Sequence, residues 1–324
     1  MNKRMILYIQ GAILLIESAI MVLPIATALI YREPAGVWFF YTALAAAICG
    51  FAAMKLSRPR TKTIYAKEGL ITVALGWIVL SLVGALPFTL SGEIPFYLDA
   101  VFEMISGFTT TGSSILPNVE ALSRCMLLWR SFSHWLGGMG ILVFMLAIVK
   151  MEGGQGIHLL RAESPGPTVG KMVPRMVDSS KILYTIYFAL TLVQVVFYLA
   201  GGMPLFDSLC NAFATAGTGG FSIKADSFAS YSPYLQTVTT VFMALFGVNF
   251  SIYFFLLQKK FDLAFKNTEL RWYVGIILFS IAMITANILP MYPDFHAAIH
   301  HAAFSVSSVI TTTGFGTENF DLWP

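Results

Sequence analysis

Threonine and glycine residues recur three times along the chain in one short arrangement. Residues 109–112 read Thr-Thr-Thr-Gly, residues 311–314 repeat that sequence, and residues 215–220 form a looser copy, Thr-Ala-Gly-Thr-Gly-Gly. Threonine offers a hydroxyl and a carbonyl oxygen, and glycine allows backbone angles that turn successive carbonyl groups to one side. Each copy follows a short apolar run. We therefore predict three ion-coordinating loops.

The register of the middle copy has two candidate solutions. Gly219 follows Thr218 as Gly112 follows Thr111, whereas Gly217 competes because residues 213–217 imitate residues 108–112. We predict Gly219, which spaces the aligned glycines about 100 residues apart, as in a repeated structural unit. The predicted cation ligands are then Thr110, Thr111, Gly112, Thr218, Gly219, Thr312, Thr313 and Gly314.

The elements that position these loops belong to a membrane protein. Of the 324 residues, 57% are hydrophobic and only 11% are charged. Soluble domains carry about 25% charged residues, so this chain has too few charges to cover a soluble surface. The net charge of +3 is small, and nucleic acid is not an expected partner.

Long apolar segments predict spans, and shorter ones predict half-helices. The predicted spans are residues 5–30, 37–54, 69–90, 125–149, 180–200, 234–257 and 272–289. Residues 95–108, 205–214 and 295–310 are too short to cross roughly 30 Å of hydrocarbon at about 1.5 Å per residue. Each precedes a threonine–glycine loop and is predicted to be a re-entrant helix, which is stable only inside protein or beside a wet cavity.

The basic residues predict the orientation. The N-terminus and the connectors 55–67, 150–181 and 259–271 hold 16 of the 20 Lys and Arg residues. The positive-inside rule places them on the cytoplasmic side, with the N-terminus. All three loops then open from the outer face.

These elements predict an all-α polytopic membrane protein built from repeats. Two leading transmembrane helices (1–66) precede pseudo-fourfold units of span, re-entrant pore helix, loop and span. Repeat one is residues 67–150, the cytoplasmic connector and repeat two are residues 151–260, and residues 261–324 begin repeat three. About two and a half repeats are present. We expect a C-terminally truncated chain that lacks the second span of repeat three and all of repeat four.

Four segments resemble a known family. They are residues 106–112 (SGFTTTG), 130–140 (RSFSHWLGGMG), 219–222 (GGFS) and 311–315 (TTTGF). Over nearly its whole length the chain resembles the Trk/Ktr/HKT superfamily of potassium transporters, and most closely the bacterial TrkH-type uptake subunits. The resemblance implies four repeats around a carbonyl-lined selectivity filter with one filter glycine each, here Gly112, Gly219 and Gly314.

The resemblance also implies the ion, the partners and the location. Serine in place of the first filter glycine accompanies sodium transport in plant relatives, so Gly112 implies potassium. We expect K⁺ as the transported ion, with no cofactor, in the bacterial cytoplasmic (inner) membrane. The implied partners are a second copy in a homodimer, a cytoplasmic nucleotide-binding regulatory ring, and membrane lipids. Whether flux is channel-like or coupled to protons or sodium stays open.

Other polar residues support competing interpretations. Arg130 and His134 share a helix face: they either line the pore and tune it by charge or, as we predict, cap or hydrogen-bond a half-helix. The nearby Gly137 is predicted to allow close packing. Three histidines, His296, His300 and His301, lack the pattern of a zinc site. A membrane-embedded enzyme using these histidines or Glu17 is the alternative function, and a non-conducting pseudo-transporter is a third.

Overall fold

A computed structural model describes residues 2–59, 66–138, 140 and 176–324. Every regular element in these ranges is a helix, as predicted. The chain forms two compact units, Met1–Lys181 and Ile182–Pro324, and each is described by itself. Residues 150–175 of the predicted connector 150–181 and residues 141–149 of the predicted fourth span lie outside the described residues, and the rest of that connector is helical, within α9.

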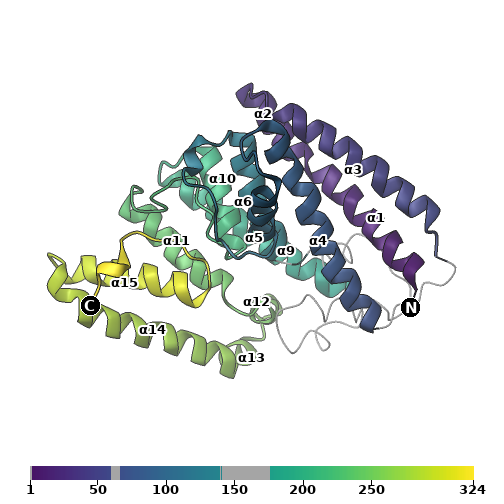
Figure 1. Ribbon diagram of the computed structural model, residues 1–324. Coiled ribbons are helices and arrows are strands. Elements are labelled where there is room, and N and C mark those ends of the chain that lie inside the picture. Colours follow the sequence, from purple (N-terminus) through teal and green to yellow (C-terminus); the bar gives the residue numbers. More distant parts are fainter. Residues whose placement is uncertain (1, 60–65, 139, 141–175) are drawn as a thin grey trace. The chain divides into compact units, whose positions relative to one another are not determined.

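The leading helices of the first unit are long and apolar. They are α1 (Lys3–Ile20), α2 (Val22–Tyr31), α3 (Gly36–Leu56) and α4 (Ala66–Ser91). Helices α1 and α2 together form one candidate span, and α1 lies between α3 and α4 (Figure 1). A Cβ atom added to Gly11 would lie 2.7 Å from the Gly50 carbonyl oxygen. Glycine on both helices thus lets α1 and α3 pack backbone to backbone, as small residues do between membrane helices.

A short helix follows these spans and packs between α4 and α6. It is α5 (Tyr97–Phe108), and after η1 (Val119–Ala121) the chain continues into α6 (Arg124–Gly138). The side chain of Trp129 on α6 is buried, donates to the Gly84 carbonyl at 3.1 Å and packs edge-on against Phe108. The Glu33 carboxylate accepts the first two backbone N–H groups of α6, from Arg124 and Cys125, and so caps this helix.

The second unit repeats the alternation of long and short helices. Its elements are α9 (Met176–Ala200), α10 (Leu205–Ala216), α11 (Pro233–Phe246), α12 (Phe250–Leu257), α13 (Phe261–Phe265), α14 (Thr268–Ile288), η3 (Leu289–Met291), α15 (Phe295–Ile310) and η4 (Phe320–Leu322). Helix α15 packs against α11 and α14 (Figure 1). A buried hydroxyl cluster joins α9 to α11, because Tyr198 lies 2.8 Å from Thr239 and accepts from Gln194 at 2.8 Å.

The predicted span over residues 234–257 is not one continuous helix. Helices α11 and α12 meet at an angle of 88°. The break is capped on both sides: the side chain of Asn249 accepts the Ser251 N–H, and the hydroxyls of Tyr253 and Tyr273 donate to carbonyls at the end of α11. These partners replace the helical hydrogen bonds that the break removes, which makes non-helical backbone acceptable there. Hydropathy is blind to such a break because both halves are apolar.

Candidate functional site

The three threonine–glycine segments have the same backbone conformation. We name them loop 1 (residues 109–112), loop 2 (217–220) and loop 3 (311–314); they follow the last residues of α5, α10 and α15. The second residue of each loop is a threonine with φ near +55°: Thr110 (55°), Thr218 (53°) and Thr312 (60°). The fourth is a glycine with positive φ: Gly112 (78°), Gly220 (74°) and Gly314 (85°).

Each loop turns back onto its own helix by the same hydrogen bond. The third residue of the loop donates its N–H to a carbonyl five residues earlier: Thr111 to Ser106 (2.9 Å), Gly219 to Ala214 (3.0 Å) and Thr313 to Ser308 (2.8 Å). This is the Schellman motif, whose left-handed position is usually glycine. Threonine is β-branched, and the left-handed conformation costs such a residue about 1–2 kcal/mol. Strain repeated at three equivalent positions is typical of functional sites.

The backbone corrects the predicted register of loop 2 by one residue. Thr218 occupies the left-handed position of Thr110 and Thr312, and therefore Gly220, not Gly219 or Gly217, corresponds to Gly112 and Gly314. Gly219 corresponds to Thr111 and Thr313, which carry side chains. A sequence signal for this register existed: Gly220-Phe221 matches Gly314-Phe315.

Loops 2 and 3 lie in the same unit and contact one another. A Cβ atom added to Gly220 would lie 1.8 Å from the Thr313 carbonyl oxygen, so only glycine fits there. Just beyond the loops, the Phe228 N–H donates to the Gly316 carbonyl at 2.9 Å, and the two rings Phe228 and Phe315 pack at 4.7 Å. Two of the three predicted copies are thus brought together.

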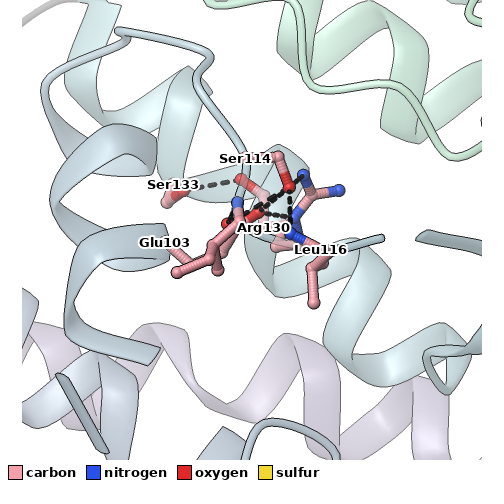
Figure 2. A network of polar contacts seen from close by, with 6 residues as sticks. Glu103, Ser114, Leu116, Arg130 and Ser133 are labelled. Carbon is pink, nitrogen blue, oxygen red and sulfur yellow. Dashed lines mark hydrogen bonds and ion pairs between the residues drawn. The ribbon is translucent and has the colours of Figure 1, made fainter. Parts of the chain in front are cut away.

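A buried ion pair anchors the segment that leaves loop 1. Glu103 on α5 and Arg130 on α6 lie 2.6 Å apart, with side-chain exposures of 0% and 2% (Figure 2). The Ser114 hydroxyl donates to both carboxylate oxygens of Glu103, at 3.0 and 3.2 Å, and the Ile115 N–H donates to one at 3.0 Å. Leu116 N–H in turn donates to the Ser114 hydroxyl. Figure 2 shows Arg130 and Ser114 converging on the Glu103 carboxylate.

The helix that carries Arg130 also contacts the start of loop 1. The His134 ring hydrogen-bonds the backbone of Ser106, and a Cβ atom added to Gly137 would lie 2.3 Å from the Phe108 carbonyl oxygen. These contacts agree with the prediction that Arg130 and His134 hydrogen-bond a half-helix and that Gly137 allows close packing. The three residues position α5 and loop 1.

The histidines of α15 act as hydrogen-bonding groups. His300 lies 2.7 Å from Gln236 on α11, and His301 lies 3.0 Å from Thr317, beyond loop 3. Among the residues that the structure describes, no group of three or more His, Cys, Asp and Glu side chains could hold a metal ion.

Comparisons with known proteins identify the family of this chain. The cation transport protein family TrkH matches residues 38–324. The chain belongs to the TrkH family. The potassium uptake proteins TrkH of Salmonella typhimurium and of Escherichia coli K12 are each 35% identical to it, over 100% of this chain and 68% of theirs. The crystal structure of the potassium transporter TrkH from Vibrio parahaemolyticus matches with a TM-score of 0.87 and 31% identity, covering 100% of this chain and 68% of that one.

Membership of the TrkH family makes this chain a membrane transport protein rather than an enzyme. One residue of its site escaped the sequence reasoning: Glu103, an acid in the middle of a predicted half-helix. Its position inside an apolar run was the available signal, because an acid there needs a partner. Glu17, which was noted for the same reason, is buried in α1, and its two carboxylate oxygens have no hydrogen-bond partner in the described part of the chain.

The α15 histidines predict a pH dependence of stability. Burial, and then the nearby His301 and His296, lower the pKa of His300 below its ordinary value of 6.5. The Gln236 amide donates to the Phe228 carbonyl, so its oxygen accepts from His300 Nε2–H, and it is burial beside two other histidines that disfavours the charged ring. A lowered histidine pKa costs nothing above the unfolded value and destabilises the fold as pH falls below it.

We expect the melting temperature of the detergent-solubilised wild type to be level above about pH 6.5 and to fall below it. In His300→Gln, which keeps an amide donor for Gln236, the fall should be smaller. Scanning fluorimetry from about pH 8 to pH 5 measures both curves. Parallel curves for the two proteins would contradict the assignment of this pH dependence to His300.

Proposed function

We propose that this chain takes up potassium across the bacterial cytoplasmic membrane, with loops 1–3 as parts of its selectivity filter. The observation that carries the proposal is the shared conformation of three loops at the C-terminal ends of short helices. The C-terminal end of a helix carries partial negative charge and favours cations. Backbone carbonyls turned to one side by left-handed residues can replace the hydration shell of the ion.

The proposed potassium ligands come from the second to fourth residues of each loop. They are Thr110, Thr111 and Gly112, then Thr218, Gly219 and Gly220, then Thr312, Thr313 and Gly314. Gly220 joins the predicted set because of the corrected register. The names of the relatives, potassium uptake proteins, support potassium as the ion.

The proposal extends to assembly and orientation. The relatives belong to a system called Trk, and we propose that this chain also works as a homodimer with a cytoplasmic nucleotide-binding regulatory ring. The distribution of Lys and Arg supports a cytoplasmic N-terminus, which brings the loops to the outer face.

Ion selectivity at Gly112 tests the function. Gly112→Ser places a hydroxyl in loop 1 at φ +78°, and we expect the ratio of potassium to sodium uptake to fall by about tenfold, a change of 1.4 kcal/mol. Proteoliposomes loaded with the purified protein and given each ion separately measure this ratio. Gly314→Arg, which adds a cation to loop 3, should stop uptake of both ions.

Gly92→Ser is the matched control for Gly112→Ser. Gly92 has φ +81° and nothing within 4 Å of an added Cβ atom, so it carries the same backbone strain outside the loops. Its uptake ratio should equal that of the wild type. Normal potassium selectivity in Gly112→Ser, or normal uptake in Gly314→Arg, would refute a filter made of these loops.

A further inference from the structure

We propose that the buried Glu103–Arg130 ion pair positions the outgoing limb of loop 1 and thereby sets how strictly this loop discriminates potassium from sodium. This inference rests on the proposed function. It concerns residues outside the loops, which touch no ion themselves and act through the backbone they hold.

The first step is that one short stretch of α5 holds both limbs of loop 1. The incoming limb is fixed where Thr111 donates its N–H to the Ser106 carbonyl at 2.9 Å. The outgoing limb is fixed one helical turn away, where Ser114 and Ile115 donate to the Glu103 carboxylate. The width of loop 1 can therefore change only if the hydrogen bonds of one of these two anchors break.

The second step is that the outgoing anchor is rigid. The Glu103 carboxylate accepts hydrogen bonds from a guanidinium, a hydroxyl and a backbone N–H, all of them protein groups. Hydrogen bonds to an ionised acceptor are charge-assisted and stronger than neutral ones. The carbonyl oxygen of Arg130 accepts from Ser133 at 2.6 Å, and an Arg130 guanidinium nitrogen lies 3.3 Å from the Ser114 hydroxyl (Figure 2). Arg130 thus touches the carboxylate and the limb that the carboxylate holds.

The third step is that the other two loops are held differently. In the backbone alignment Asn211 and Ser305 stand where loop 1 has Glu103. The amide of Asn211 donates to Tyr231 at 3.3 Å, a neutral bond. Loops 2 and 3 contact each other, and the segment after loop 3 is bound by Ser227 and Phe228 from the segment after loop 2. In the described chain, only loop 1 has a limb held by a buried ion pair.

Discrimination depends on this limb because sodium and potassium differ in radius by less than half an ångström. A ring of carbonyls selects the larger ion when it resists closing around the smaller one, through its size or its field strength. Releasing one limb of loop 1 lets its carbonyls approach a sodium ion. Loss of the ion pair should therefore lower the selectivity for potassium over sodium without stopping potassium uptake.

Two variants separate positioning from general stability. Glu103→Gln removes the charge and keeps the shape and one acceptor, whereas Ser114→Ala leaves the ion pair intact and removes the hydroxyl that joins it to the outgoing limb. We expect both to lower the potassium-to-sodium uptake ratio in proteoliposomes by about three- to tenfold, with potassium uptake retained. Ser114 lies on an exposed segment, so Ser114→Ala carries the test if Glu103→Gln fails to fold.

Asp262→Asn is the matched control. It removes the carboxylate from another ion pair, Asp262–Lys266, whose side chains are 89% and 81% exposed. Its uptake ratio should equal that of the wild type. A ratio unchanged in Ser114→Ala would overturn the inference while leaving the proposed function intact. Absence of potassium uptake by the wild type would instead refute the function itself.

Discussion

Replacing Gly220 with alanine is expected to abolish potassium uptake. The added Cβ atom would lie 1.8 Å from the Thr313 carbonyl oxygen, a distance at which the backbone of loop 2 or loop 3 must move. A left-handed φ of +74° adds about 1–2 kcal/mol of strain for alanine. Both effects fall on backbone that is proposed to coordinate the ion, so function should be lost even where the protein still folds. Uptake of rubidium or potassium into proteoliposomes measures the loss.

Two control variants isolate the cause. Gly202→Ala has nearly the same backbone angle, φ +82°, and nothing lies within 4 Å of its Cβ atom. It should keep full uptake, and only its free energy of unfolding should fall, by the backbone strain. Gly219→Ala tests the register, because the equivalent residues Thr111 and Thr313 carry side chains. It should be much less damaging than Gly220→Ala. The reverse order of the two loop variants would show that the backbone alignment is wrong.

Gly137→Ala is expected to cause the second large loss of uptake. A Cβ atom here would lie 2.3 Å from the Phe108 carbonyl oxygen and 2.8 Å from the Thr110 side chain. Helix α6 cannot keep its place beside α5 with this atom present, and the last turn of α5 and the left-handed Thr110 must shift. In enzymes a misplacement of about 1 Å can cost about a hundredfold in rate, and we expect ion coordination by loop 1 to be similarly sensitive to the position of its backbone.

The control is the same substitution on an exposed helix. Gly275 lies in α14 with nothing within 4 Å of an added Cβ atom, and alanine is about 1 kcal/mol more favourable than glycine in a helix interior. Gly275→Ala should therefore retain uptake and melt at the same or a higher temperature. If Gly137→Ala transports as well as Gly275→Ala, then α6 does not set the position of loop 1.

The sequence was sufficient to predict most of the helices, including the three short ones that precede the Thr-Gly segments, because apolar length and the Thr-Gly pattern are local signals. The predicted half-helix 295–310 coincides with α15, and the predicted 205–214 falls within α10. Hydropathy could not predict the bend between α11 and α12, although Gly247 and the capping Asn249 are local signals of a helix break; one further partner, Tyr273, lies in another helix.

The sequence was a weaker guide to the register of loop 2 and to the partners of buried side chains. The register at Gly220 was settled by the left-handed backbone of Thr218, although the match of Gly220-Phe221 to Gly314-Phe315 was a sequence signal for it. Glu103 became visible as an anchor only when folding brought it to Arg130, 27 residues later in the chain. Glu17 was noted from its type alone, and its carboxylate lies beside Gly84, 67 residues later in the chain.

The contact between Gly220 and the Thr313 carbonyl constrains how this sequence can evolve. Copies of a repeated unit ordinarily diverge independently, each accumulating its own substitutions. Here the volume that a side chain at position 220 would need is filled by main-chain atoms of another copy. Every amino acid has these main-chain atoms, so no substitution at position 313 can remove them. Position 220 is therefore closed to every residue but glycine for as long as the two copies stay in register, whatever drift occurs around them.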